Sequence, residues 1–344
     1  MLGTPLSSEA LLARFSGLRL LVVGDVMLDR FLRGTVSRVS SEAPVPVVEV
    51  RSESLYPGGA ANVARNLAPF AARVELAGLY GLDTDGDLLE EALAAHGIGM
   101  SPCLRREECA TVAKTRVVAR GQQVLRIDRE GRLPPSPGLA EELLDRIRET
   151  LPRVDGVVVA DHGTGLVGRE LAAGLLVAAA ERGLPVAVDP RPGNPAEWRG
   201  AAAVKPNRRE AFAFAGRLDE HLDEGVPPLE DGPLLETGAH LLERWECGHL
   251  LLTLGEQGML VFSRGSGPVH LPAKAREVFD VSGAGDTAIA IHTLGLCAGL
   301  PPAVAARVAN LASGLVVGKL GTAPVEREEL LEAVAREFPD GVRG

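Results

Sequence analysis

Aromatic residues are scarce in this chain, at 3% of 344 residues, so leucine, valine and alanine must fill its core. The four cysteines form no CxxC pair, which argues against a zinc site or a disulfide framework and favours reduced thiols. No block of five or more lysines and arginines occurs and the net charge is −10, so nucleic acid is a poor candidate partner. No apolar run reaches the roughly 18 residues of a membrane helix, and residues 1–15 lack a signal-peptide core. We therefore expect a cytoplasmic protein with no membrane partner.

Short apolar runs alternate with helical patterns along most of the sequence. Strands are expected at 18–24, 74–78, 156–160, 185–189, 202–205 and 249–254, and helices at 60–70, 85–96, 168–182, 208–215, 283–298, 302–317 and 327–337. This alternation predicts an α/β fold with a mainly parallel central sheet and helices on both faces. Ligands of such sheets bind beyond the carboxyl ends of the strands, where Asp25, Asp161, Asp189 and Asn207 are expected.

Two stretches depart from this alternation. The segment near Val45–Val50 is β-like, and Thr111–Asp128 alternates β-branched with Lys, Arg and Gln residues, which is typical of an antiparallel pair with one exposed face. We assign segments near 35–52 and 111–127 to a small β lid on a single domain spanning 1–344. The acidic stretch 219–236 is interpreted as a surface loop. Because exposed strand edges tend to be paired, the lid strands predict a homodimer.

The sharpest motif is DVSGAGDT at 280–287, which directly precedes an apolar helical run. A turn of Gly283, Ala284 and Gly285 that opens a helix presents unpaired backbone N–H groups, and such a nest binds phosphate oxygens. Asp286 at its mouth can accept a proton from an attacking hydroxyl, and phosphoryl transfer needs mainly this positioning, charge neutralisation and base. The alternative interpretation is an ordinary helix start with Asp286 as a dipole partner.

DVSGAGDT resembles the signature of the PfkB/ribokinase family of carbohydrate kinases, and other motifs extend the resemblance over nearly the whole chain. The segment GGAAN at 58–62 resembles its sugar-binding glycine signature, NRRE at 207–210 its NxxE motif, and TLGEQG at 253–258 its nucleotide-binding loop. Taken alone, these segments could be a plain turn, a helix capping box and a hairpin turn. Their order and spacing together favour the family.

The resemblance implies a ribokinase-like fold and the ATP-dependent phosphorylation of a sugar-like hydroxyl. It implies that Asp286 is the catalytic base and that the backbone of Gly283, Ala284, Gly285 and Asp286 forms an anion hole. It also implies nucleotide contacts from Asn207, Glu210, Thr253, Gly255, Gly258 and Asn310. Mg²⁺ would be held indirectly, through water and phosphate, by Asn207 and Glu210, and a monovalent cation such as K⁺ is left open.

A more specific resemblance is to the D-glycero-β-D-manno-heptose-7-phosphate kinases of ADP-heptose and lipopolysaccharide synthesis. It is carried by GDVMLDR at 24–30, SRVSSEAPVPVV at 37–48, PGGAANVA at 57–64 and VVGKLGT at 316–322. It implies transfer of phosphate to O1 of heptose 7-phosphate, giving the 1,7-bisphosphate. Many of these kinases carry a C-terminal nucleotidyltransferase with an HxGH motif. That motif is missing here, so we expect a kinase alone.

The sugar and its phosphate need different side chains. Short polar groups can accept sugar hydroxyls, and the residues expected to surround the sugar are Asp25, Asp29, Gly58, Gly59 and Asn62. The 7-phosphate needs cations, and the candidates are Arg38, Lys114, Arg116, Arg120 and Arg126. The even spacing of Lys114, Arg116, Arg120 and Arg126 would put these four on one face of an unbroken strand, but a turn near Gly121 is expected to break it. A solvated lid face is the alternative for each of them.

Other functions remain open. The runner-up is another kinase of the same family acting on ribose, fructose 1-phosphate or a nucleoside. A nucleoside would favour stacking residues, and only Phe31 and Tyr56 are near the 25–62 region. A non-catalytic sugar-phosphate-binding protein is disfavoured because Asp286 is present. A Rossmann dehydrogenase is disfavoured because GDVMLD stands in place of GxGxxG after the first strand.

Overall fold

The computed structural model describes residues 5–130, 138–220, 225–274, 281–319 and 323–343. Its central sheet has eight strands in the order β14-β13-β12-β11-β10-β9-β1-β4. These are β1 (Arg19–Gly24), β4 (Arg73–Ala77), β9 (Gly156–Ala160), β10 (Val186–Asp189), β11 (Ala203–Val204), β12 (His249–Thr253), β13 (Met259–Ser263) and β14 (Val269–Leu271). Strands β1, β4, β9, β10, β11 and β12 run parallel to one another, and β13 pairs antiparallel with both β12 and β14. The expected mainly parallel sheet is confirmed, whereas β13 and β14 were not predicted.

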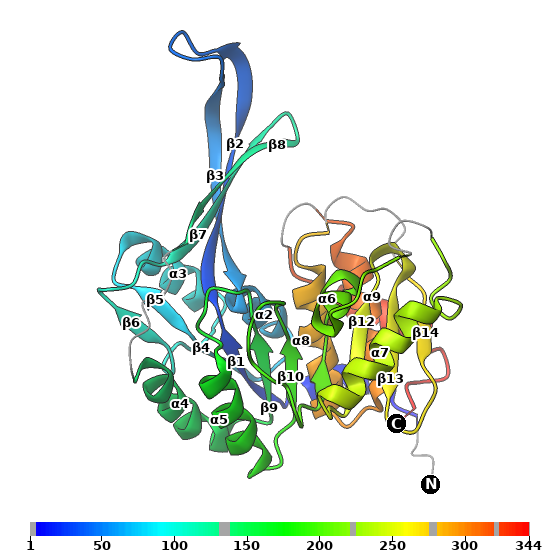
Figure 1. Cartoon of the computed structure of the whole chain (residues 1–344). Coiled ribbons are helices and arrows are strands. Elements are labelled where there is room, and N and C mark those ends of the chain that lie inside the picture. The colour runs from blue at the N-terminus through cyan, green and yellow to red at the C-terminus, as the bar shows by residue number, and fades with distance from the viewer. Residues whose placement is uncertain (1–4, 131–137, 221–224, 275–280, 320–322, 344) are drawn as a thin grey trace.

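Helices cover both faces of this sheet (Figure 1). One core cluster includes residues of α1 (Ser8–Phe15), α2 (Ala60–Leu67), α3 (Thr84–Ala94), α8 (Ala284–Cys297), α9 (Pro302–Val316) and α10 (Arg327–Glu337). The other includes residues of α4 (Leu139–Thr150), α5 (Arg169–Ala180), α6 (Arg208–Ala215) and α7 (Gly232–Arg244). Leu20 and Val22 of β1 belong to the first cluster, and Leu21 and Val23 to the second, because successive side chains on a strand point to opposite faces.

A second sheet forms the lid, with four strands in the order β3-β2-β7-β8. They are β2 (Val26–Val39), β3 (Pro46–Gly59), β7 (Val112–Ala119) and β8 (Gln122–Arg129). The β2–β3 hairpin projects from the body as a long arm that extends past β7 and β8 (Figure 1). The expected lid is present, but it begins at Val26, only one residue after β1, rather than near residue 35. A small parallel pair, β5 (Leu79–Gly81) and β6 (Leu104–Arg106), lies near its base.

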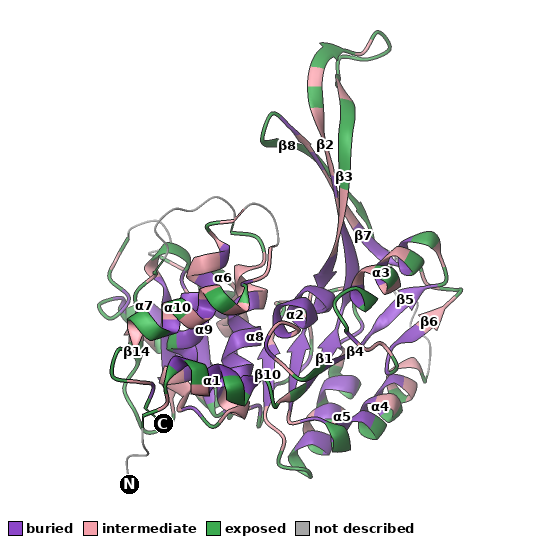
Figure 2. Ribbon diagram, turned by 180° about the vertical axis from the view of Figure 1, so that it is seen from behind, coloured by how far each residue is buried: buried purple, intermediate pink, exposed green. Residues whose placement is uncertain are grey.

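The lid is far more exposed than the body (Figure 2). Every residue of β8 is exposed, whereas every residue of β9 in the central sheet is buried. Large apolar side chains are also exposed on the lid, namely Val39, Val45, Val50, Val124, Leu125 and Ile127. In the described part of the chain, no helix is long and apolar enough to cross a membrane.

The acidic stretch 219–236 is only partly the surface loop expected from its composition. Residues 232–236 begin α7, whose N-cap Asp231 is fully buried. Arg208 pairs with both Asp219 (2.6 Å) and Asp231 (2.8 Å), so this arginine ties the stretch to α6. The acidic residues therefore serve partly as internal partners, and residues 221–224 lie outside the described residues.

Candidate active site

A cavity of about 740 Å³ lies beyond the carboxyl ends of the parallel strands, and we call it the main cavity. Strands β9, β10 and β12 end at its wall, and α8 and α9 close the opposite side. The predicted nucleotide residues Asn207, Glu210, Thr253, Gly255, Gly258 and Asn310 all line it. Asn310 is held by a bond from its Nδ2 to the carbonyl of Pro272 (2.8 Å). The predicted nucleotide residues thus come from three distant segments of the sequence and line one cavity.

The GAGD segment opens α8 at the wall of the main cavity. Gly283 is the N-cap, with a φ of 82° in the left-handed region that favours glycine. Among the described residues no side chain caps this helix start; the N–H of Ala284 donates to the carbonyl of Val281 (3.3 Å), which leaves the N–H groups of Gly285 and Asp286 for an anion. Asp280, the first residue of the motif, lies outside the described residues.

A buried ion pair stands beside this helix start. Lys205 Nζ lies 3.0 Å from Asp189 Oδ1, and a Cβ on Gly285 would lie 3.3 Å from the same Nζ. Burial raises the pKa of Asp189 to about 6, although Lys205 opposes this shift. For Lys205 burial acts to lower the pKa, but Asp189 outweighs it and the pKa is raised, so the ammonium stays charged at neutral pH. The positive charge therefore adds to the anion-binding character of the α8 N-terminus.

Asn207 and Glu210 form the capping box that was the alternative interpretation of NRRE. Asn207 Oδ1 accepts from the N–H of Glu210 (2.9 Å), and Glu210 Oε2 accepts from the N–H of Asn207 (2.8 Å). Both side chains nevertheless line the main cavity, and Glu210 Oε1 lies 3.7 Å from Arg191 Nη1. The cap fixes the orientation of two oxygen-bearing side chains at the cavity wall, so the capping box is compatible with the predicted role of these residues in nucleotide binding.

Asp286 joins the main cavity to the base of the lid. Its Oδ2 accepts a bond of 2.6 Å from Asn62 Nδ2 of α2. One turn further along α2, Asn66 Oδ1 accepts from Thr287 Oγ1 (2.8 Å), so α2 and α8 are linked twice. Asn62 Oδ1 is buried and has no hydrogen-bond partner among the described residues. Asn62 therefore orients the carboxylate of Asp286 and keeps one acceptor atom available.

The other predicted sugar residues lie where β2 and β3 join the body next to α2, and together with Asp286 we call them the lid-base cluster: Asp25, Asp29, Gly58, Gly59, Asn62 and Asp286. Gly58 must be small, since a Cβ there would meet Asp29 Oδ2 at 2.5 Å. Asp25, between β1 and β2, accepts from the N–H of His162 (2.7 Å) and from Thr164 Oγ1 (2.5 Å). Asp25 thus holds the loop after β9 and is already largely bonded.

The five candidate cations do not lie together. Strand register places Lys114, Arg116 and Arg126 on the lid face that carries Asp29. Each has a carboxylate partner: Arg116 pairs with Asp29, Lys114 with Glu130 (3.5 Å) and Arg126 with Asp128 (2.8 Å).

The remaining two cations are further out. Arg38 is nine residues beyond Asp29 on β2, which at strand rise is about 30 Å. Arg120 lies at the β7–β8 turn, with a φ of 52°, and donates to the carbonyl of Val36 (3.2 Å). The turn expected near Gly121 is confirmed, and Arg38 and Arg120 are separated from the lid-base cluster.

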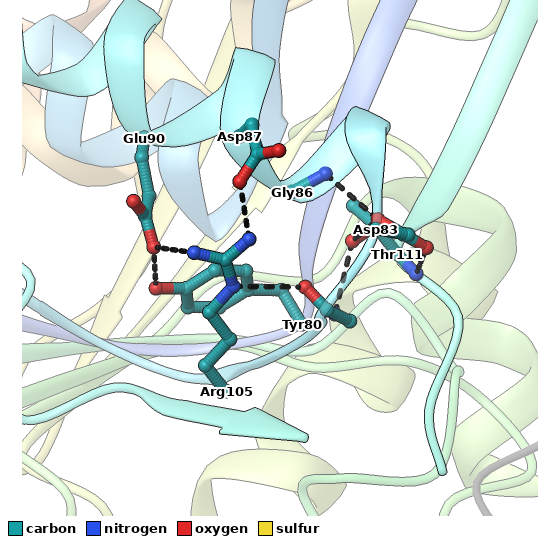
Figure 3. A network of polar contacts seen from close by, with 8 residues as sticks. Tyr80, Asp83, Gly86, Asp87, Glu90, Arg105 and Thr111 are labelled. Carbon is teal, nitrogen blue, oxygen red and sulfur yellow. Dashed lines mark hydrogen bonds and ion pairs between the residues drawn. The ribbon is translucent and has the colours of Figure 1, made fainter. Parts of the chain in front are cut away.

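Polar contacts fasten the lid to α3 (Figure 3). Asp83, the N-cap of α3, accepts from the N–H (2.9 Å) and Oγ1 (2.6 Å) of Thr111, which directly precedes β7. The buried carboxylate of Asp85 accepts from Arg30 of β2 and from Arg129 of β8, both at 2.9 Å. Beside them, Arg105 bonds Glu90 (3.1 Å) and contacts Asp87. Hydrogen bonds and ion pairs therefore fix the base of the lid to the body, and we call these contacts the ionic base of the lid.

Sequence reasoning missed three side chains at this site. His162 lines the main cavity, lies next to Gly59, and has a buried Nε2 without a partner among the described residues. Its position just after Asp161 at a strand end was an available signal. Lys205, two residues before Asn207, carried no such signal because its burial arises from tertiary structure. The third is Arg65, a buried residue of α2.

A parallel α/β sheet, an anion-binding helix start beside a carboxylate, and a lid with polar residues at its base are together the features of an ATP-dependent sugar kinase. Residues 18–328 match the model of the pfkB family carbohydrate kinases. The chain therefore belongs to the pfkB family of carbohydrate kinases.

Curated relatives and solved structures agree with this assignment. The chain is 40% identical over 333 residues to "Bifunctional protein HldE" of Trichlorobacter lovleyi, covering 96% of this chain and 66% of the relative. The protein of the same name from Magnetococcus marinus is 42% identical, over 91% of this chain and 63% of the relative. The chain thus spans about two thirds of the length of these relatives.

The solved structures show the likeness of the fold. The ribokinase of Arabidopsis thaliana complexed with ribose and ATP has a TM-score of 0.70 at 20% identity, covering 92% of this chain and 98% of that structure. Phosphofructokinase-2 from Escherichia coli in complex with potassium also has a TM-score of 0.70, at 18% identity, over 93% of this chain and 99% of that structure. The ribokinase-like fold expected from the sequence is confirmed.

Proposed function

We propose that this chain uses ATP to phosphorylate D-glycero-β-D-manno-heptose 7-phosphate at O1, giving the 1,7-bisphosphate in ADP-heptose and lipopolysaccharide synthesis. The observation that carries the transfer chemistry is the position of Asp286, which faces Asn62 at the seam between the main cavity and the lid-base cluster. The choice of sugar is supported by SRVSSEAPVPVV at 37–48 and by the likeness to proteins named HldE.

In this proposal ATP occupies the main cavity, with its phosphates at the N-terminus of α8 and at Lys205. The acceptor lies in the lid-base cluster with its O1 hydroxyl next to Asp286. The hydroxyl oxygen attacks the γ-phosphorus, the bond from that phosphorus to the β-phosphate oxygen breaks, and Asp286 accepts the hydroxyl proton. The α8 N–H groups and Lys205 stabilise the charge that develops on the phosphoryl oxygens.

The oxygen donors at the cavity wall suit Mg²⁺ held through water and phosphate. Asn207 and Glu210 are hard ligands of the kind that Mg²⁺ prefers, and their capping box fixes them at the wall. In the described part no group of three His, Cys, Asp or Glu side chains could hold a metal, so the phosphates would complete the coordination. Mg²⁺ would neutralise phosphate charge, and EDTA should abolish activity until Mg²⁺ is restored. A K⁺ requirement should be tested as well, because a structural neighbour is in complex with potassium.

The 7-phosphate is assigned to the lid face that carries Asp29. Arg116 and Lys114 lie on this face near the lid base, with 19% and 20% of their side chains exposed, whereas Arg126 is half exposed further out. Their carboxylate partners hold them in place and can be exchanged for a phosphate that brings more charge. Arg38 and Arg120 are not assigned to the clamp in the same subunit.

The lid also supports a homodimer. Both β3 and β8 are edge strands of a sheet with large exposed apolar residues, and such edges are usually paired or covered. A second copy of the chain is the simplest cover, because two lids would bury these residues against each other. We propose a cytoplasmic homodimer joined through the lid strands.

An ADP-release assay with a panel of acceptors tests the proposed substrate. The panel contains heptose 7-phosphate, heptose, ribose, fructose 1-phosphate and fructose 6-phosphate, each with and without EDTA. We expect the highest kcat/KM for heptose 7-phosphate. Preference for another acceptor would overturn the proposed substrate while leaving the family assignment intact.

A further inference from the structure

Arg65 is a buried cation with no ion-pair partner in the described part of the chain. It lies on α2 with 2% of its surface exposed, and its Nε and Nη2 are buried atoms with no hydrogen-bond partner among the described residues. No carboxylate of the described part of the chain comes within ion-pair distance of it. Taking a guanidinium out of water costs several kcal/mol unless hydrogen bonds or an opposite charge compensate. Such a group therefore either destabilises the folded protein or gains its missing hydrogen bonds and opposite charge from a bound ligand.

The surroundings of Arg65 point to the lid-base cluster. It follows Asn62 by three positions on α2, so both side chains lie on neighbouring parts of one helix face. Its Cζ stands 5.5 Å from the ring centre of Tyr56, which pairs with Asp29 across β2 and β3. Burial lowers the pKa of Arg65, while the nearby Tyr56, Asp29 and Asp286 act to raise it.

A row of aromatic and guanidinium groups connects Arg65 to the lid cations. The Tyr56 ring packs edge-on against Phe31 at 5.7 Å, and Arg116 stands over Phe31 at 5.2 Å. Asp29 contacts Arg116 and also acts on the charge of Arg65 from further away. Arg116 thus has a carboxylate in direct contact, whereas Arg65 has none among the described residues.

We propose that Arg65 binds the anionic group of the acceptor and so determines the preference for a phosphorylated sugar over the same sugar without phosphate. This rests on the proposed function only in taking the chain to be a sugar-phosphate kinase; it does not require the sugar to be heptose. A phosphate carries up to two negative charges, so Arg65 and Arg116 can bind it together, with Tyr56 and Phe31 fixing the planes of the two guanidinium groups.

The test compares kcat/KM for a sugar phosphate with kcat/KM for the same unphosphorylated sugar. The sugar is the best acceptor of the panel, and the variants are R65Q, R65M and R65K. We expect R65Q and R65M to lower the preference for the phosphorylated form by roughly 10- to 150-fold, the scale of one charge-assisted phosphate contact, and R65K to recover part of it. The matched control is R33Q, because Arg33 lies on the same lid face but is bonded to Ser54 (3.0 Å).

Thermal unfolding separates binding from a structural role. Because R65M removes an unpaired buried charge, its Tm without ligand should equal or exceed that of the wild type, and the sugar phosphate should raise the Tm of the wild type more than that of R65M. An unchanged preference in both R65Q and R65M would overturn the proposal, as would an equal loss in R33Q. If the preferred acceptor is a different sugar phosphate and R65Q loses the preference, the heptose assignment fails and the Arg65 proposal stands. If the wild type prefers an unphosphorylated sugar, both fail.

Discussion

The central sheet and the lid are built from similar strands but are stabilised in different ways. In β1 every residue after Arg19 is buried, and the two faces of the sheet belong to two large clusters of apolar side chains. In the lid, β8 is exposed along its whole length, and the sheet is fixed at its base by ion pairs to Asp85. The body is therefore stabilised by the burial of apolar side chains. The lid is stabilised by its ion pairs to the body and by any partner that covers its exposed apolar residues.

The candidate active site divides along the same line. The main cavity is built from residues of the body between Asp161 and Val317. The lid-base cluster is built around the two strands that leave the body, with Asp286 as the contribution from the main cavity side. Changes in the body should therefore alter transfer or stability, whereas changes in the lid should alter acceptor binding and assembly.

The largest effect is expected at the seam of the two regions. Asp286→Asn keeps the shape of the side chain but removes the base, so kcat should fall by about 10²–10⁴-fold while ATP binding persists. Steady-state ADP release and ATP titration measure the two properties. Asp145→Asn on the exposed surface of α4 is the control and should behave as the wild type. A D286N enzyme with more than half the wild-type kcat would refute the assigned base.

The second prediction tests the ionic base of the lid. Asp85→Asn removes the charge that holds Arg30 and Arg129, so the lid should close less well over the acceptor. We expect kcat/KM for the acceptor to fall by roughly 10- to 100-fold, the scale of a lost buried charge-assisted bond, with the Kd for ATP unchanged. Asp87→Asn is the matched control on the same helix, because Asp87 is largely exposed. An equal loss of ATP affinity would show that lid and body are not separable.

The third prediction tests what covers the lid. Leu125→Lys with Ile127→Lys places two charges on β8, where 54% and 53% of the two residues are exposed. The wild type should be a dimer at micromolar concentration by light scattering, and the double variant should dissociate at least about 10-fold more readily. Val177→Lys is the control, since Val177 is equally exposed on α5 of the body. A monomeric wild type would contradict the lid dimer.

The smallest effect belongs to the body. His249 and His292 are buried against each other with their Nε2 atoms 2.6 Å apart, and burial lowers the pKa of His249 to about 4. Burial also lowers the pKa of His292. Because the unfolded chain takes up these protons first, stability should fall as the pH drops from about 6.5 to 4, by roughly 1–3 kcal/mol.

Urea unfolding across this pH range measures the effect, with the variant His249→Gln plus His292→Leu as the control. The loss of unfolding free energy at low pH should be smaller in the variant. The affinity for the acceptor, which depends on the lid, should not change in parallel with this loss. If the free energy of unfolding falls equally with decreasing pH in both proteins, the two histidines do not titrate as described.

The sequence predicted the body better than the lid, and the reason is physical. Buried parallel strands are apolar runs that end in polar residues, so the pattern alone places Asp25, Asp161, Asp189 and Asn207 at or just past strand ends. The start of β2 was not placed in this way, because the apolar residues from Val26 to Leu28 are too few to show the alternation of a separate strand directly after Gly24 and Asp25.

The site was predictable where it depends on local sequence. The GAGD turn is such a case, since glycines next to an acidic residue before an apolar helical run predict the helix start that the structure shows at Gly283. The capping box of Asn207 and Glu210 was also visible, but only as one of two interpretations. Arg65 and Lys205 were missed because a single basic residue does not show its burial in the sequence, whereas His162 had a signal in its position just after Asp161 at a strand end. Burial arises only when distant elements pack.

The bond between Asn62 and Asp286 joins residues that are 224 positions apart, and this separation has a consequence in time. During synthesis α2 leaves the ribosome long before α8 is made, so Asn62 and Asn66 lack their hydrogen-bond partners on α8 during that time. Contacts of such long range also form late in refolding, because a large loop must close first. Helix and sheet content should therefore return before kinase activity does, because the carboxylate that we propose as the base is in place only when the whole chain has folded.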